Sequence, residues 1–180
     1  MQIFDDSFKD IFSSQLISIF WGLAAGIILA IYTNEILLIP GMLILLPGFL
    51  EMRGNISGAA ASRISSGMFL GIIKPDAFSS PTVRGNIIAS FILAIIISLF
   101  LGIVAFAFTL FVFGVFETKI IFIALIAGII ANTVEIAITV TATFYLFKKG
   151  HDPNNIMGPF ITSTGDLTSI IALLIALVII

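Results

Sequence analysis

The sequence predicts an all-α membrane protein with five transmembrane helices in each protomer. Of its 180 residues, 59% are hydrophobic and only 10% are charged, and the mean hydropathy is +1.24. Soluble domains are roughly 45–50% apolar and about 25% charged. The apolar residues also gather in runs of about twenty, the length that a helix needs to cross a bilayer. Polar segments with Lys, Arg, Pro and Gly separate these runs.

The chain is expected to consist of a short N-terminal segment and one membrane domain. Residues 1–10 contain three acids and one lysine, the wrong charge for a signal peptide, and no small-residue cleavage site follows. We therefore expect an amphipathic cytoplasmic lead-in that the mature protein keeps. The domain at 11–180 follows, with helices expected at 11–32, 36–70, 87–113, 120–147 and 156–180.

Polar or helix-breaking residues mark the ends of these five helices. The first is closed by the polar residues 33–35, and the third follows a loop at 74–85 that contains two prolines. The second is interrupted by Pro40, by Pro47 and by the polar stretch 48–66. A break at Pro47 is expected to widen a path or to expose backbone carbonyls. The fourth helix is strongly apolar, and the fifth has polar residues near its middle.

The basic residues predict how the helices are oriented. With five crossings, most of them fall on one side of the membrane: Lys9, Lys74, Arg84, Lys148 and Lys149. The opposite side has a single basic residue, Lys119. Because cytoplasmic loops are enriched in Lys and Arg, we expect a multi-pass plasma-membrane protein with its N-terminus in the cytoplasm and its C-terminus outside.

Polar side chains at membrane depth indicate where function lies, because a charged one costs roughly 2.5–3.5 kcal/mol at a helix centre. Such residues occur in three predicted helices, at spacings that place those of one helix on a single face. They are Glu51, Asn55 and Ser62 in the second helix, Asn132 and Glu135 in the fourth, and Thr162 and Asp166 in the fifth. We expect the three faces to converge on one site.

The chemistry of these side chains is that of oxygen ligands, which hard cations such as Mg²⁺ prefer. The sequence contains no cysteine, and its single histidine, His151, falls in a polar loop. Mg²⁺ gives up its water reluctantly and is often held by one or two carboxylates. We expect Asp166, Glu135 and Asn55 to bind the cation directly, and the other polar residues to line its path.

Several of these residues also have structural interpretations. Arg53 and Arg63 are interpreted as partners of Glu51 or as caps of helix carbonyls, and Glu51 is as well explained by such a pair as by ion contact. Gly54, Arg63 and Pro47 are expected to shape the path. Asn132 and the threonines also fit hydrogen bonds between helices or within one turn. Glu135 and Asp166 have no basic residue within one turn in the sequence, which favours a functional role.

Five helices are too few to enclose a polar path, so a twofold homodimer with the cation path at its interface is expected. Gly22 and Gly26 form a GxxxG pattern, and 58–61 adds a second group of small residues. Such patterns allow helices to approach closely. They fit packing within one chain as well as packing between two.

Two motifs resemble a known family. Gly54-Asn55 is followed by ASRISS at 61–66, and DPNN at 152–155 is followed by PFITSTGDL at 159–167. Together they resemble the integral membrane domain of the MgtE magnesium transporters, and most of all the eukaryotic solute-carrier branch of that superfamily. The resemblance covers nearly the whole chain.

This resemblance implies a five-helix protomer that dimerises, with a cation path between the second and fifth helices of the two copies. The key carboxylate of the family falls on Asp166, and its Gly-Asn motif falls on Gly54 and Asn55. Bacterial MgtE carries G-N-A-G-x-Q, whereas this chain has G-N-I-S-G-A, so the glutamine is missing. No regulatory soluble domain is expected in this chain, and the solute-carrier relatives fuse two such repeats where this chain has one.

The expected function is therefore the transport of divalent cations, with Mg²⁺ first and Mn²⁺ and others as further candidates. An enzyme is not expected, since the chain has no H-E-x-x-H motif, no cysteine and a single deeply placed Asp, Asp166. The expected partners are a second copy and the lipid bilayer, and no nucleic acid. A structural or assembly subunit, using its polar helix faces to bind a partner, is the alternative.

Overall fold

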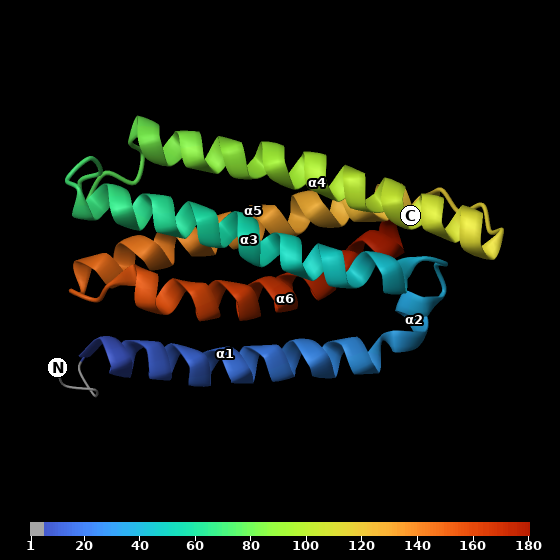
Figure 1. The fold of residues 1–180 in the computed structure, drawn as a ribbon, viewed down its shortest axis with the longest axis horizontal. Helices are drawn as coiled ribbons and strands as arrows, with labels where there is room; N and C mark the ends of the chain where they lie inside the picture. The colour runs from blue at the N-terminus through green and yellow to red at the C-terminus, as the bar shows by residue number, and fades with distance from the viewer. Residues whose placement is uncertain (1–5) are drawn as a thin grey trace.

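The computed structural model describes residues 6–180, which form six α-helices and their connections (Figure 1). In chain order these are α1 (Asp6–Ile31), α2 (Thr33–Leu37), α3 (Met42–Phe69), α4 (Pro81–Phe113), α5 (Lys119–Lys148) and α6 (Pro153–Ile179). The five long helices contain 26 to 33 residues. The predicted all-α class is confirmed.

The long helices run alternately up and down, with α3, α5 and α6 packed together at the centre (Figure 1). The outer helix α4 packs on α3 and α5, and the outer helix α1 packs on α6 at the other side of the bundle. The start of α1 and the α3–α4 and α5–α6 connections lie at one end. There Lys148 Nζ lies 2.6 Å from Asp76 Oδ1, and His151 Nδ1 lies 3.1 Å from Asp10 Oδ1.

In the part of the chain that is described, four helices are long and apolar enough to cross a membrane: α1 from Ser7 onward, α4, α5 and α6. Their outer faces carry exposed Phe, Ile, Leu and Val side chains, which suit contact with lipid tails. α3 has the length of a crossing helix but contains Glu51, Arg53 and Arg63. The multi-pass prediction is thus confirmed, while the fifth crossing stays a prediction.

The predicted second helix, 36–70, is divided near Pro40, one of the two prolines at which an interruption was expected. α2 ends at Leu37, and α3 begins only at Met42. Gly41 lies between them with φ = 91°, a left-handed conformation that favours glycine. A Cβ at this position would also collide with Thr109 and Ile120. The break expected at Pro47 does not occur, since α3 continues through this residue, although Pro47 cannot donate a hydrogen bond to the carbonyl one turn before it.

Three predicted helix starts also lie too late in the sequence, because residues that read as loop form the first turns of helices. α4 begins at Pro81, with Ser80 Oγ accepting a hydrogen bond from the Val83 amide at 3.4 Å. α6 begins at Pro153, and Asp152 Oδ1 accepts from the Asn154 amide at 2.9 Å. Proline suits the first helical position, where its missing N–H is not needed. Part of the predicted lead-in, 1–5, lies outside the described residues, and the rest belongs to α1.

Small residues allow α4 and α5 to pack closely. A Cβ at Gly102 would lie 2.9 Å from the Ile121 Cα and 3.1 Å from the Ala124 Cβ. A Cβ at Gly128 of α5 would lie still closer to a neighbour, 2.7 Å from the Ser98 Cβ of α4. Because lipid tails are as apolar as the side chains, such close van der Waals packing is a main source of attraction between membrane helices.

Candidate functional site

A polar groove of about 390 Å³ lies between α3 and α6. Its lining combines carboxylates, an amide, a hydroxyl, three glycines and two apolar side chains. From α3 come Pro47, Leu50, Glu51, Gly54, Asn55 and Gly58, and from α6 come Gly158, Thr162 and Asp166. Four of the residues that were predicted to line a cation path are therefore neighbours: Glu51, Asn55, Thr162 and Asp166.

Helical spacing explains why these residues share the groove. On α3 they recur every three or four positions, and on α6 every four, so each set forms one face of its helix. Gly54 keeps the two faces close. A Cβ at Gly54 would already lie 3.4 Å from Thr162 Oγ1. A larger residue at Gly54, Gly58 or Gly158 would fill the space between the polar groups.

The polar atoms of the groove leave oxygen atoms available. Asn55 Nδ2 donates to Glu51 Oε1 at 3.2 Å, which directs the Asn55 carbonyl oxygen elsewhere. Thr162 Oγ1 donates to the Gly158 carbonyl at 3.0 Å, and its lone pairs stay free. Asp166 is half-buried, while Glu51 and Asn55 are exposed. The carboxylates of Asp166 and Glu51 interact electrostatically as like charges.

The third predicted polar face does not reach the groove. Glu135 is fully buried on α5, where Oε1 accepts a hydrogen bond from Thr164 Oγ1 at 3.1 Å and Oε2 accepts one from Thr168 Oγ1 at 3.2 Å. Both threonines belong to α6. Asn132 is also fully buried, and neither polar atom of its side chain has a hydrogen-bond partner among residues 6–180. The α5 face therefore lies behind α6 and does not line the groove, although Glu135 is close enough to Asp166 for the two charges to interact.

The positive charge that acts on Glu135 is Arg53, which was expected from the sequence to pair with Glu51 or to cap a helix, although no hydrogen bond or salt bridge joins Arg53 to Glu135. Arg53 is fully buried, and its guanidinium interacts electrostatically with Glu135. It also lies 5.6 Å above the Phe49 ring, and Nη2 lies 3.8 Å from the Met52 sulfur. Two residues along a helix correspond to a rotation of about 200°, so Arg53 faces away from Glu51. The sequence showed that both charges lie at membrane depth, but not that they are close enough to interact.

Two further predicted residues lie outside the groove. Ser62 and Arg63 are exposed on α3, beyond the groove residue Gly58. The glycines of the GxxxG pattern are Gly22 and Gly26, and a Cβ added to either would have no atom of another helix within 4 Å. Within the described part of one protomer, this pattern does not serve helix packing.

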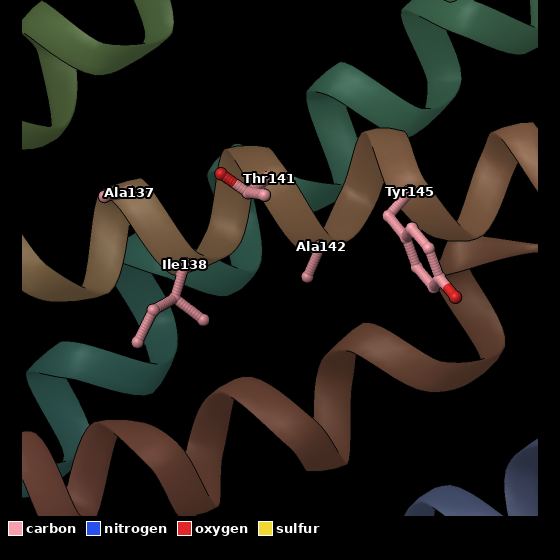
Figure 2. A pocket seen from close by; sticks show the side chains of 5 residues that line it. All are labelled: Ala137, Ile138, Thr141, Ala142 and Tyr145. Atoms are coloured by element: carbon pink, nitrogen blue, oxygen red, sulfur yellow. The ribbon is translucent and has the colours of Figure 1, made fainter.

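A second hollow, of about 480 Å³, lies along α5 (Figure 2). Figure 2 shows Ile138 and Ala142 directed toward the neighbouring helix α6, with Tyr145 at one end. The complete lining is Ala137, Ile138, Thr141, Ala142 and Tyr145. It contains no carboxylate or amide, so it lacks the ligands that a hard cation needs.

The groove suits a hydrated cation better than a fully stripped one. In residues 6–180 no group of three or more His, Cys, Asp or Glu side chains could hold a metal ion. The groove offers two carboxylates, one amide oxygen and one hydroxyl. Mg²⁺ commonly keeps several waters and is bound through one or two carboxylates. The groove supplies that number of carboxylates.

Comparison with known proteins agrees with this chemistry. The family model of MgtE, described as a divalent cation transporter, matches residues 46–176. The match begins in α3 and ends in α6, so it includes every residue of the groove. No curated protein matches the chain, and no solved structure does. With its long apolar helices it is a multi-pass membrane protein. The chain belongs to the MgtE family of divalent cation transporters.

Proposed function

We propose that this protein carries Mg²⁺ across the membrane along the groove between α3 and α6, with Asp166 as the principal carboxylate. The observation that supports this most directly is the meeting of Glu51, Asn55, Thr162 and Asp166 in one groove. These residues come from two helices that are far apart in the sequence. Polar groups gathered in this way within an apolar bundle mark an ion path.

The ligand types favour Mg²⁺ and similar hard divalent cations. All polar groups of the groove present oxygen, and cysteine is absent from the sequence. The volume of about 390 Å³ exceeds what a bare ion fills, because one water molecule occupies about 30 Å³. The ion would therefore travel with part of its water shell, held at Asp166 and at the Asn55 carbonyl oxygen. Mn²⁺ has the same preference for oxygen ligands.

A second copy of the chain would complete the path. Two grooves facing each other across a twofold axis would enclose a channel, and each would contribute one Asp166. Two carboxylates at close range repel each other in a medium of low dielectric constant. A divalent cation between them removes this repulsion. A homodimer in the lipid bilayer, in which the chain has a second copy of itself as its partner, is thus part of the proposal.

In this arrangement α3 is the fifth crossing helix. Of its charged side chains, Glu51 lines the groove and Arg53 is buried inside the bundle, while Arg63 is exposed beyond the groove. An odd number of crossings places the termini on opposite sides. The basic residues at the end that holds the N-terminus make this end cytoplasmic in the plasma membrane.

The test is Mg²⁺ flux into liposomes that contain the purified protein and a Mg²⁺-sensitive dye. Asp166→Asn should abolish flux while the protein still folds. In the parent, Mg²⁺ at a hundred times its Kd should stabilise the folded state by about 2.7 kcal/mol, and this gain should vanish in the variant. Asp76→Asn, the same change in an exposed loop, is the control and should behave as the parent does.

Two outcomes would contradict the proposal. If the Asp166→Asn protein carries Mg²⁺ at the parent rate, the principal carboxylate lies elsewhere. If the parent itself gives no Mg²⁺ flux in intact liposomes but binds a membrane partner, the protein is an assembly subunit.

A further inference from the structure

The two threonines that bind Glu135 lie on either side of Asp166 in the sequence. Thr164 precedes Asp166 by two positions, and Thr168 follows it by two. Their hydroxyls donate to the two different oxygens of the same carboxylate, at 3.1 and 3.2 Å. One side chain of α5 therefore spans a full turn of α6, the turn that contains Asp166.

The threonines and Asp166 face opposite sides of α6. Positions four apart lie on one face, and a position midway between them lies about 200° of rotation away from either. Thr164 is buried and Thr168 half-buried against α5, while Asp166 lines the groove toward α3. Glu135 accordingly binds the back of the turn whose front presents the Asp166 carboxylate.

The hydrogen bonds to Glu135 compete with bonds inside α6. Thr164 Oγ1 also lies 2.8 Å from the Phe160 carbonyl, and Thr168 Oγ1 lies 3.1 Å from the Gly165 carbonyl. Each hydroxyl has a single proton. An ionised carboxylate is a stronger acceptor than a backbone carbonyl, so Glu135 draws the threonine hydroxyls toward the helix interface, and a neutral amide in its place would hold them less strongly.

Arg53 places a positive charge of α3 near the same carboxylate. A Cβ at Gly165, between the two threonines, would lie 3.3 Å from the Arg53 Cβ and 3.8 Å from Glu135 Oε1. The three helices thus meet closely at Gly165. Arg53 immediately precedes Gly54, which lines the groove. Its guanidinium is the nearby positive charge that interacts with Glu135, and a buried carboxylate is strongly destabilising without such a partner.

We propose that Glu135, with Arg53 as its counter-charge, is a positioning residue that holds the turn of α6 carrying Asp166 at a fixed place relative to α3, without touching the ion. This replaces direct ion contact, the role expected from the sequence, and it rests on the proposed function of Asp166. Glu135 is fully buried and contributes no atom to the groove. Its two hydrogen bonds act on the cation site through the orientation of α6, and its charge also interacts with that of Asp166.

The first experiment removes the two threonine hydroxyls and leaves every charge in place. Thr164→Val with Thr168→Val keeps side-chain shape but ends both bonds to Glu135. The half-saturating Mg²⁺ concentration for transport should rise on the order of tenfold, as for partners that orient a metal ligand. The control is Thr109→Val, a buried threonine whose hydroxyl donates only to the Ala105 carbonyl. It should keep the half-saturating Mg²⁺ concentration of the parent.

The second experiment separates positioning from ion binding. Glu135→Gln and Arg53→Met each leave one buried charge without its partner, and each should raise the half-saturating Mg²⁺ concentration or prevent folding. The double variant has neither charge, and the glutamine can still bind both threonines. It should recover a half-saturating concentration within a few-fold of the parent. If Glu135 were an ion ligand, the double variant would be as defective as Glu135→Gln.

The results distinguish failure of this inference from failure of the proposed function. Normal flux in Asp166→Asn would refute the proposed function. If Asp166→Asn abolishes flux while the double valine variant keeps the parent's half-saturating Mg²⁺ concentration, only the positioning role is wrong. A fall in melting temperature without any change in this concentration would reduce Glu135 to a purely structural group. Should the charge variants fail to fold, the valine pair alone decides.

Discussion

Glu51 and Asp166 occupy the same groove in different surroundings. Glu51 is exposed and accepts a hydrogen bond from Asn55, whereas Asp166 is half-buried. A charge acts more strongly where less water surrounds it, because the effective dielectric constant is lower. The two carboxylates should therefore contribute unequally to cation binding.

We predict that Glu51→Gln raises the half-saturating Mg²⁺ concentration of transport but does not abolish flux. Its effect should shrink as the salt concentration rises, since exposed charges are screened within about 8–10 Å at ordinary ionic strength. Flux measured at several Mg²⁺ and salt concentrations checks this. A loss of transport as complete as that expected for Asp166→Asn would make Glu51 an equal ligand.

At this scale, helical spacing in the sequence was enough to place Glu51 with Asn55 and Thr162 with Asp166. It could not show that Glu135 lies behind α6. The spacing along one helix gives the face that a residue shares with its neighbours, but not the rotation of that helix relative to the others. The pairing of Arg53 with Glu135 depends on the rotations of α3 and α5 together, so it becomes visible only in the structure.

Prolines mark different features in different helices. Pro81 and Pro153 begin α4 and α6, each directly after a capping side chain. Pro159 lies inside α6 and cannot donate to the Asn155 carbonyl. Ser14 of α1 lies 3.4 Å from this carbonyl, within reach of a long hydrogen bond. Pro81 and Pro153 were expected in loops. The capping residues directly before them, Ser80 and Asp152, were the sequence signal that each proline begins a helix.

Glycines at helix crossings lead to a second prediction. Gly102→Val should push α4 from α5, because its Cβ would lie 2.9 Å from backbone of α5. Overpacking of this kind typically costs about 1–3 kcal/mol. Thermal unfolding of the purified protein in detergent measures the loss.

Gly22→Val is the matched control for this change. It introduces the same side chain into α1, where a Cβ has nothing within 4 Å in the protomer. It should alter the melting temperature much less than Gly102→Val does. Equal losses in the two variants would show that the cost does not come from the α4–α5 crossing, since valine is a better helix former than glycine and a Cβ at Gly22 meets no atom within 4 Å in the protomer.

For the whole molecule, the end where α1 begins also holds the α3–α4 and α5–α6 connections (Figure 1). The charged contacts between Lys148 and Asp76, and between His151 and Asp10, agree with this grouping. The sequence could predict that the long helices alternate in direction, because the number of helices and the short loops between them determine this order. Which helices touch could not be predicted, since helices that are apolar nearly all round give no sign of the face that packs.

The orientation in the membrane gives a third prediction. The chain contains no cysteine, so single cysteines can be introduced without first replacing native ones. Cysteines at Asn34 in α2 and at Thr118 before α5 should react with an impermeant reagent added outside intact cells, and one at Lys149 should not. Labelling of Lys149→Cys ahead of the other two would reverse the proposed orientation.

The packing of α1 on α6 has a consequence for how the protein is made. These are the first and last helices of the described chain, and α1 has extensive contacts with α6 alone among the long helices. A ribosome delivers α1 to the membrane first, and its packing partner only after α2 to α5 have been synthesised. During that interval α1 is surrounded by lipid, which its exposed apolar residues tolerate. Insertion of α6 then forms both the groove with α3 and the surface on which α1 packs, in a single late step. If synthesis stops before α6, the groove and the packing surface for α1 are both missing.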